Sequence, residues 1–293
     1  MRIVTRPDFD GIVCAVLLLD AETIDTQILW TEPGEIQNNS VDINHGDIMA
    51  NLPYDDRCLK WFDHHISNQI NKPFNGAFQI APSAARVIYD HYRTKLTGRY
   101  EKLIKETDKI DAALLSMNEV CYPENYPYVL LSMTITNRDK ADEAYWNKLV
   151  GLLRKRPIEA VMEDTDVKEK CEAIIKQNTI YKDILQKYTT LNQHIAITDL
   201  RSFDKAPFGN RFLVYALFPE TTVSIRVRHA DNDKNKIIMS VGHNIFNQNC
   251  RVNIGLMLSA YNGGGHKGAG ACSFDAVHYD QYINEIIDIL IKN

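Results

Sequence analysis

The sequence lacks the marks of several protein classes. Its six cysteines are scattered along the chain without a CxxC pair, which excludes both a cysteine zinc framework and a disulfide scaffold. No stretch approaches the roughly 20 apolar residues that span a bilayer. Charge arrives too early in the opening MRIVTRPDFDG for the apolar core of a signal peptide. We therefore expect a protein of the reducing cytoplasm with no membrane partner.

Excess positive charge is also missing. The formal net charge is −5 and the isoelectric point is near 6.0, which argues against broad, sequence-blind binding to long nucleic acids. A local basic pocket is compatible with that total, because net charge says little about one cleft. With 293 residues, 45% of them hydrophobic and 24% charged, the chain has a globular composition and the length of two domains.

The first half alternates short apolar runs with helical patterns. Ile3 and Val4 lie in an expected first strand, and further strands are expected at 27–30, 41–44 and 59–62. A nearly apolar helix is expected at 12–20, and helical patterns dominate from residue 82 onward. This order predicts an α/β fold whose N-terminal domain, residues 1–165, has a mainly parallel sheet wrapped by helices.

The second half has a different sequence pattern. Residues 166–191 have the pattern of one long, charged, amphipathic helix that links two domains. Beyond it, several β-rich runs separated by turn residues precede a helical stretch at 252–262. The sequence therefore predicts a smaller C-terminal α+β domain at 192–293.

Polar residues follow two of the expected strands. Asp8 and Asp10 lie in the turn DFDG after the first strand. The carboxyl ends of strands in an open α/β sheet are where ligands bind, so both side chains are candidates for a site. For either aspartate alone, an N-cap on the next helix is an equally good account. The strand ending in Asp63, His64 and His65 is a stronger signal, since burying a carboxylate and two imidazoles without partners is costly.

Three further signals are weaker by themselves. Asp47 follows the expected strand 41–44, where ordinary turn chemistry is the competing account. Asp108 and Asp111 share one face of an expected helix, where a solvated charged face is the competing account. The glycine-rich run GGGHKGAG at 263–270 favours an anion site over a plain bend, because its glycines let the backbone approach a ligand and His266 and Lys267 add positive charge.

Taken in order, DFDG, Asp47, DHH, Asp108 and GGGHKGAG resemble the DHH phosphoesterase family with its DHH-associated C-terminal domain. The motifs span nearly the whole chain, and GDIMANLPYD and VGHNIFN are similar to the exopolyphosphatase-related branch. NanoRNases, single-strand DNA exonucleases and cytosolic exopolyphosphatases belong to this family. The resemblance implies a phosphohydrolase with two Mn²⁺ ions, Mg²⁺ being the alternative. Oxygen and imidazole ligands suit these ions independently of the resemblance.

The resemblance also assigns roles to residues. The implied metal ligands are Asp8, Asp10, Asp47, His64 and Asp108. The implied catalytic group is Asp63, His64 and His65, with Asp63 supporting the site and His65 facing the substrate phosphate. The implied phosphate-binding residues are His65, Arg226 and His266. The chemistry of the residues themselves adds Gly263, Gly264 and Gly265 of the glycine-rich run and Arg6 as candidate substrate-binding residues.

Arg6 departs from the family pattern. Many members have a metal-binding histidine two residues before the first aspartate of the DxD pair, and a guanidinium does not coordinate a cation. Either Arg6 occupies or weakens the first metal site, or it binds a substrate phosphate as a bidentate donor.

The expected substrate is a small phosphorylated molecule, namely a short RNA or DNA oligonucleotide or a nucleotide, cut at phosphodiester or phosphomonoester bonds. An exopolyphosphatase or pyrophosphatase acting on phosphoanhydrides is the alternative within the same class. A non-catalytic nucleotide or phosphate sensor is the alternative of another class, and a homodimer is compatible with the sequence.

Overall fold

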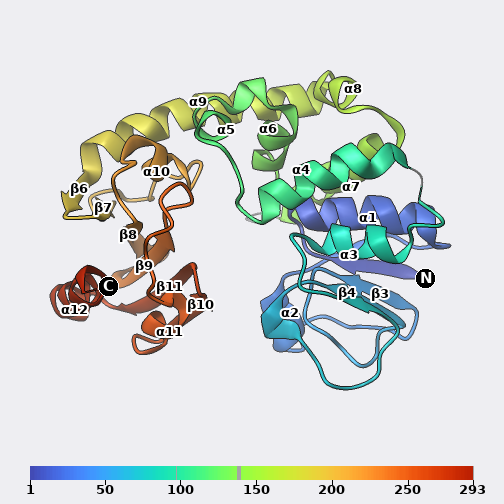
Figure 1. The fold of residues 1–293 in the computed structure, drawn as a ribbon, viewed down its shortest axis with the longest axis horizontal. Coiled ribbons are helices and arrows are strands. Elements are labelled where there is room, and N and C mark those ends of the chain that lie inside the picture. The colour runs from blue at the N-terminus through green and yellow to red at the C-terminus, as the bar shows by residue number, and fades with distance from the viewer. Residues whose placement is uncertain (97, 137–139, 293) are drawn as a thin grey trace. The chain divides into compact units, whose positions relative to one another are not determined.

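The computed structural model describes residues 1–96, 98–136 and 140–292 (Figure 1). The chain divides into two compact units. Unit 1 comprises Met1–Leu115 and Pro123–Glu172, and unit 2 comprises Ser116–Tyr122 and Ala173–Asn293. Helix α9, Thr165–Tyr188, begins in unit 1 and continues into unit 2. The functional domain boundaries at 165 and 191 stay predictions.

Unit 1 is built on a five-stranded sheet in the order β2-β1-β3-β4-β5, with every neighbouring pair parallel. The strands are β1 Arg2–Thr5, β2 Leu29–Trp30, β3 Asp47–Ala50, β4 Lys60–Asp63 and β5 Gly76–Phe78. The central strands are apolar on both faces, as is typical of a parallel sheet covered by helices. The strand expected at 41–44 is wrong, because the apolar run 48–50 forms β3 instead.

Helices cover this sheet. They are α1 Phe9–Ala21, α2 Pro33–Gln37, α3 Ala84–His91, α4 Glu101–Asp111, α6 Pro127–Met133, α7 Glu143–Lys155 and α8 Ile158–Met162. Helix α1 is almost wholly buried and contacts α3, α4 and α7, which explains why its sequence is apolar on all sides. The first turn of α1, directly after β1, is therefore held in place by the packing of the core.

Unit 2 is a mixed α+β structure. Its six-stranded sheet has the order β10-β11-β9-β8-β7-β6, in which only β7 and β8 pair in parallel. The strands are β6 Thr189–Asn192, β7 Ile195–Asp199, β8 Val223–Ala230, β9 Asp233–His243, β10 Gly263–His266 and β11 Ala269–Asp275. The helices are α5 Met117–Cys121, α10 Leu213–Leu217, α11 Ile254–Ser259 and α12 Tyr279–Ile291, besides α9.

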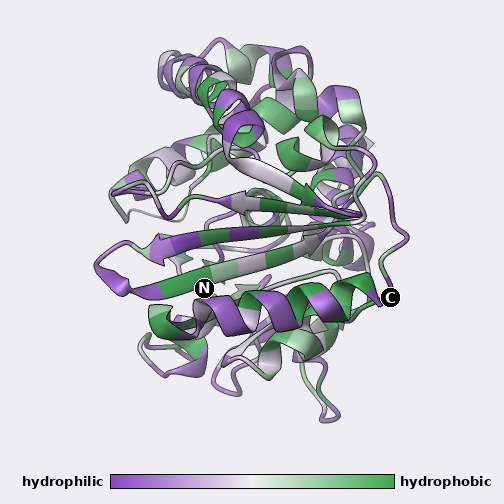
Figure 2. Ribbon diagram, turned by 90° about the vertical axis from the view of Figure 1, so that its left-hand side faces the viewer, coloured by the Kyte–Doolittle hydropathy of each residue, from purple (hydrophilic) through white to green (hydrophobic). Residues whose placement is uncertain are grey.

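The amphipathic pattern of α12 shows how unit 2 forms its core. Figure 2 shows hydrophobic and hydrophilic segments alternating along this helix. Ile283, Ile286 and Leu290 are buried in one cluster with the apolar residues of β8 and β9. The predicted fold class, a parallel sheet wrapped by helices followed by a smaller α+β part, is confirmed. Among the described residues, no helix is long and apolar enough to cross a membrane.

Candidate active site

The turn after β1 places two carboxylates at the start of α1. Asp8 is the N-cap of the helix, and its Oδ1 accepts a hydrogen bond from the backbone N–H of Gly11 at 2.8 Å. A Cβ at Gly11 would lie 2.0 Å from the carbonyl oxygen of Arg6, so only glycine fits this tight approach. Asp8 therefore makes the cap, which leaves Asp10 in the first turn free for another role.

Asp10 is held by the beginning of a second helix. Its side chain accepts hydrogen bonds from the backbone N–H groups of Ala84, at 2.8 Å, and Ala85, at 2.9 Å, in the first turn of α3. The positive end of the helix dipole favours a carboxylate there. Burial, followed by the charge of Asp8, nevertheless raises the pKa of Asp10 to about 7. The carboxylate is positioned by the fold and lacks full charge compensation.

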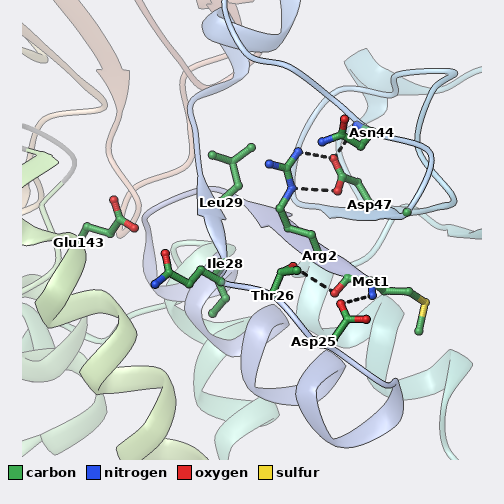
Figure 3. Close-up of a pocket in the computed structure, with 11 residues that line it drawn as sticks. Met1, Arg2, Asp25, Thr26, Ile28, Leu29, Asn44, Asp47 and Glu143 are labelled. Carbon is green, nitrogen blue, oxygen red and sulfur yellow. Dashed lines mark hydrogen bonds and ion pairs between the residues drawn. The ribbon is translucent and has the colours of Figure 1, made fainter.

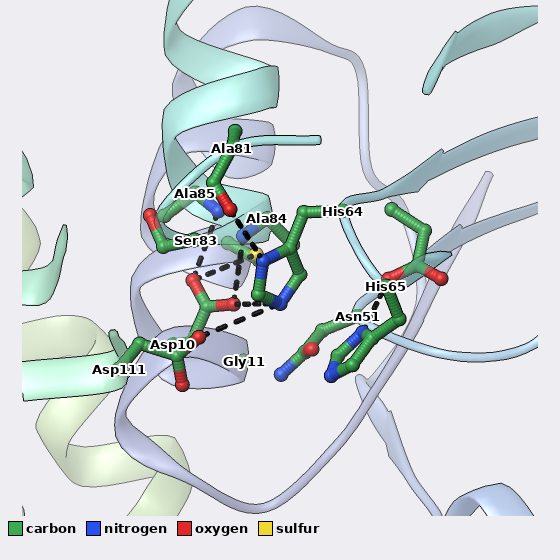
Figure 4. Close-up of polar contacts among 12 residues, drawn as sticks. Asp10, Gly11, Asn51, His64, His65, Ala81, Ser83, Ala84, Ala85 and Asp111 are labelled. Atoms are coloured by element: carbon green, nitrogen blue, oxygen red, sulfur yellow. Dashed lines mark hydrogen bonds and ion pairs between the residues drawn. The ribbon is translucent and has the colours of Figure 1, made fainter. Parts of the chain in front are cut away.

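His64 directly follows β4 and points at this carboxylate (Figure 4). Its Nδ1 lies 3.0 Å from the carbonyl oxygen of Ala81, so the ring proton sits on Nδ1 and Nε2 presents its lone pair. That Nε2 is buried and has no hydrogen-bond partner within the described part of the chain. It lies 3.9 Å from Oδ2 of Asp10 and 3.4 Å from Oδ2 of Asp111.

Asp111 completes this cluster from the last turn of α4. Its side chain is 30% exposed. Burial of the carboxylate is the largest cause that raises its pKa, to about 8, and the negative charges of Asp10 and Asp8 are the next largest. Ligand atoms of Asp10, His64 and Asp111 all lie within 4.8 Å of one another. Two crowded carboxylates and a buried, unpartnered imidazole nitrogen fit a divalent cation, and oxygen and nitrogen donors suit Mn²⁺ or Mg²⁺.

Asp108, the ligand expected on α4, has protein partners in this structure. Its carboxylate accepts hydrogen bonds from the Ser83 hydroxyl at 2.7 Å and from the Arg86 guanidinium at 2.7 Å. These contacts tie α4 to the start of α3, and the helical turn directs Asp111, three residues on, toward His64. The sequence indicated that both positions share one helix face, and in this structure Asp111 is the one that lies beside His64.

Asp47, the expected bridging ligand, lies away from the cluster around His64. It begins β3 and pairs in register with Arg2, so it lies at the amino end of the parallel sheet, while Asp8 and His64 follow the carboxyl ends of β1 and β4. Figure 3 shows the Arg2 guanidinium bound to Asp47 by two parallel hydrogen bonds, of 2.9 and 2.6 Å. The backbone N–H of Asn44 donates to the same carboxylate at 2.8 Å. This is a structural ion pair.

Asn51 takes the place at the carboxyl end of β3 that was expected for Asp47. The residue is 2% exposed, adopts a positive φ of 57°, and donates from Nδ2 to Oδ1 of Asp8 at 3.0 Å. Its Oδ1 is buried and makes no hydrogen bond within residues 1–96, 98–136 and 140–292. Asn51 was not among the expected site residues because the strand was predicted at 41–44. The apolar run 48–50 ending in a polar residue is the signal that points to it.

The remaining two residues of the DHH motif form a separate pair. Asp63 is fully buried, and its carboxylate accepts hydrogen bonds from Nδ1 of His65 at 2.8 Å and from Nδ2 of Asn68 at 2.7 Å. Burial opposes protonation of His65, but the hydrogen bond and the charge of Asp63 outweigh it, so its pKa is raised. The two histidine rings lie 4.1 Å apart at 64°, and they are directed by different partners.

Arg6 lies beside the cluster, between two acidic groups. Its Nη1 lies 3.3 Å from Oδ2 of Asp8, and its Nε donates to Oε2 of Glu32 at 3.1 Å. Burial opposes the charge of the guanidinium, but the neighbouring charges of Asp8 and Glu32 raise its pKa further above the usual value. Arg6 is therefore a fixed cation next to Asp8.

The expected phosphate-binding residues of the C-terminal half lie in unit 2. Gly263, Gly264, Gly265 and His266 form β10, which pairs with β11 in a hairpin. A Cβ at Gly263 or Gly265 would lie 2.3 to 2.4 Å from backbone oxygens of β11, so packing alone requires glycine at both positions, whereas Gly264 faces open space. Arg226 lies on β8 and makes no ion pair with any residue that the structure describes.

Comparisons with known proteins place this arrangement in a family. No family sequence model matches the chain, and no curated protein sequence is found to match it. Among solved structures, the chain is similar to the pGpG-specific phosphodiesterase PggH from Vibrio cholerae, with 32% identity, a TM-score of 0.84 and coverage of 99% of each chain.

Two more distant structures share the fold. An exopolyphosphatase-related protein from Bacteroides fragilis has 12% identity and a TM-score of 0.55, with 99% of this chain and 93% of that chain covered. The exonuclease RecJ bound to manganese has 11% identity and a TM-score of 0.57, with 100% of this chain and 90% of that chain covered.

The parallel sheet, the polar cluster at its carboxyl end and the full-length similarity at 32% identity together define a class of hydrolase acting on phosphate esters. The chain belongs to the DHH family of phosphoesterases and is a metal-dependent phosphohydrolase, which confirms the function class predicted from the sequence. The alternative of a non-catalytic sensor is thereby set aside.

Proposed function

We propose that this phosphohydrolase cleaves the phosphodiester bond of short oligoribonucleotides, with linear dinucleotides such as pGpG as the preferred substrate. The observation that carries the proposal is the similarity to PggH, which extends over 99% of both chains at 32% identity. The acidic net charge of −5 agrees with a short substrate, because a long nucleic acid would need a broad basic surface.

The proposed cation site consists of Asp10, His64 and Asp111. The support is the buried, unpartnered Nε2 of His64 facing two carboxylates. We propose Mn²⁺ as the ion and Mg²⁺ as its substitute, since solved RecJ structures hold one or the other. When bound, a divalent cation supplies Lewis acidity to a phosphoryl oxygen and lowers the pKa of a bound water.

The residues around that site have distinct proposed roles. The proposed role of His65 is to contact a substrate phosphate, with Asp63 fixing the ring and favouring its charged form. Asn68 holds the second oxygen of Asp63. Arg226 and His266 of unit 2 stay proposed phosphate-binding residues.

A substrate panel tests the proposal. The purified protein is incubated with pGpG, pApA, a longer oligoribonucleotide, single-stranded DNA, a cyclic dinucleotide, pyrophosphate and polyphosphate, each with Mn²⁺ and with Mg²⁺. We expect kcat/KM to be highest for the linear dinucleotides, and the same preparation with Asp10→Asn to be inactive. Faster release of phosphate from pyrophosphate or polyphosphate than of mononucleotide from pGpG would contradict the proposal.

A further inference from the structure

The two oxygens of Asp8 are both engaged by donors of the protein itself. Oδ1 accepts from the Gly11 N–H at 2.8 Å and from Asn51 Nδ2 at 3.0 Å, and Oδ2 faces the Arg6 guanidinium at 3.3 Å. Burial still raises the pKa of Asp8, but the guanidinium beside it and the two donors to Oδ1 stabilise the charged form. Asp8 differs from Asp10 in its charged partner: the oxygens of Asp10 also accept hydrogen bonds, from the Ala84 and Ala85 N–H groups, but Asp10 and Asp111 face the imidazole of His64.

Arg6 is not a side chain that a cation could easily displace. Its Nε is bound to Glu32 at 3.1 Å, and its side chain is 34% exposed, so it is fixed on one side and partly enclosed. Glu32 is itself the N-cap of α2 within a capping box, so its position follows from the fold. A guanidinium carries a permanent positive charge and has no lone pair to offer a metal.

Asn51 removes a further negative charge from the same place. Because Asp8 is only an acceptor, it requires the NH₂ group of Asn51 on its side, which turns Oδ1 of Asn51 away from Asp8. A carboxylate at position 51 would instead face Asp8 without a proton between them. The amide adds no negative charge beside Asp8, Arg6 and Glu32 that would draw in another cation.

The charges that remain fit a single ion. Arg6 lies between Asp8 and Glu32, and Asp63 is engaged by His65 and Asn68, so the two carboxylates that face His64 are Asp10 and Asp111. Their two negative charges balance one divalent cation, while a second cation would meet Arg6 as a like charge.

We propose that this phosphohydrolase binds one divalent cation per chain, at Asp10, His64 and Asp111, and that Arg6, with the neutral Asn51, takes the place of a second. The inference rests on the proposed cation site. It differs from the two-ion centre implied by the sequence resemblance, and it assigns Arg6 to charge compensation of Asp8 instead of to binding a substrate phosphate.

Bound Mn²⁺ is counted by elemental analysis after gel filtration and by calorimetric titration with Mn²⁺ alone. Four proteins are compared with the natural one: Arg6→His, Arg6→His/Asn51→Asp, Asp10→Asn, and Arg93→His as a control that adds an imidazole on an exposed arginine elsewhere. We expect one Mn²⁺ per chain in the natural protein and in Arg93→His, two in Arg6→His/Asn51→Asp, and a large loss of affinity in Asp10→Asn.

The outcomes separate the two proposals. Two ions in the natural protein would overturn the single-ion inference and leave the proposed cation site standing, whereas none at saturating Mn²⁺ would overturn the cation site itself. A folded double variant that still binds one ion would also overturn the inference. Arg6→Ala gives an independent measurement. With Asp8 uncompensated, Mn²⁺ should raise its unfolding temperature more than that of the natural protein, and an equal or smaller rise would contradict the role of Arg6.

Discussion

The two ends of the five-stranded sheet each hold an arginine beside an aspartate, with different results. At the amino end, Asp47 accepts two hydrogen bonds from Arg2 and one from the Asn44 backbone. At the carboxyl end, Arg6 makes a single 3.3 Å contact with Asp8, close to two buried polar atoms without partners, His64 Nε2 and Asn51 Oδ1.

An unsatisfied buried polar group costs about 1–3 kcal/mol, so a fold retains one only where something else is gained. Asn51 also has a left-handed backbone conformation, with φ 57°, which adds a cost of about 1–3 kcal/mol. The amino end has neither feature in its Arg2–Asp47 pair. Residue type alone therefore does not distinguish a structural ion pair from a functional site. The two are distinguished by whether the buried polar atoms around them all have hydrogen-bond partners.

The largest effect is expected from removing a charge at the carboxyl end. Asp10→Asn keeps the shape of the side chain but removes one of the two carboxylates that face His64. Loss of a group that only supports a metal ligand lowers metal affinity or activity by about 10–100-fold. Asp10 is a proposed ligand itself, so we expect both kcat/KM and Mn²⁺ affinity to fall by more than about 100-fold. Kinetics and calorimetric titration measure both. Activity within tenfold of the natural protein would place the cation elsewhere.

Asp63→Asn should have the next largest effect, and of a different kind. The carboxylate of Asp63 is engaged by His65 and Asn68 and fixes the ring of His65, so we expect kcat to fall by about 10–100-fold while Mn²⁺ affinity is kept within about tenfold. Asn68→Ala, which removes only the second partner of Asp63, is the matched control and should reduce kcat less. A parallel loss of Mn²⁺ binding in Asp63→Asn would instead make Asp63 a ligand.

The comparison of the two ends also shows what the sequence could and could not predict. The parallel sheet, the wrapped helices and the position of DHH after a strand followed from apolar runs and their order, which are local signals. The expected place of Asp47 depended on one misplaced strand. Moving β3 from 41–44 to 47–50 shifts the carboxyl end of the strand from Asp47 to Asn51. Strand register is a tertiary property, because it depends on the pairing of Arg2 with Asp47.

The choice between Asp108 and Asp111 likewise depends on contacts that are not local in the sequence. Both positions on α4 are polar and share a face, so the helix pattern does not separate them. What separates them is a residue far away in the sequence. Arg86 of α3 binds Asp108, and His64 is left to Asp111. The sequence alone shows that Arg6 is unusual at its position. It does not show that Glu32 is its partner, because that contact joins the end of β1 to the start of α2.

At the amino end, Asp47→Ala should affect stability and spare activity. The change leaves the Arg2 guanidinium partly buried without its acceptor, and breaking one side of a buried pair costs about 3 kcal/mol at the lower end of the usual range. We expect denaturant unfolding to shift accordingly. The Mn²⁺ count and the kcat per folded chain should stay at the natural values. A loss of bound Mn²⁺ at unchanged stability would restore Asp47 as a ligand.

The smallest effect is expected at Asp108. Its ion pair with Arg86 is partly exposed, and such pairs contribute about 0–1 kcal/mol, so Asp108→Asn should lower stability only slightly and leave Mn²⁺ affinity unchanged. The matched change Asp111→Asn, three residues away on the same helix, removes a carboxylate 3.4 Å from His64 Nε2 and should weaken Mn²⁺ binding by more than about tenfold. Calorimetric titration of the two variants side by side decides between them. If Asp108→Asn weakens Mn²⁺ binding more than Asp111→Asn does, α4 contributes the ligand expected from the sequence, and the cluster around His64 is not the cation site.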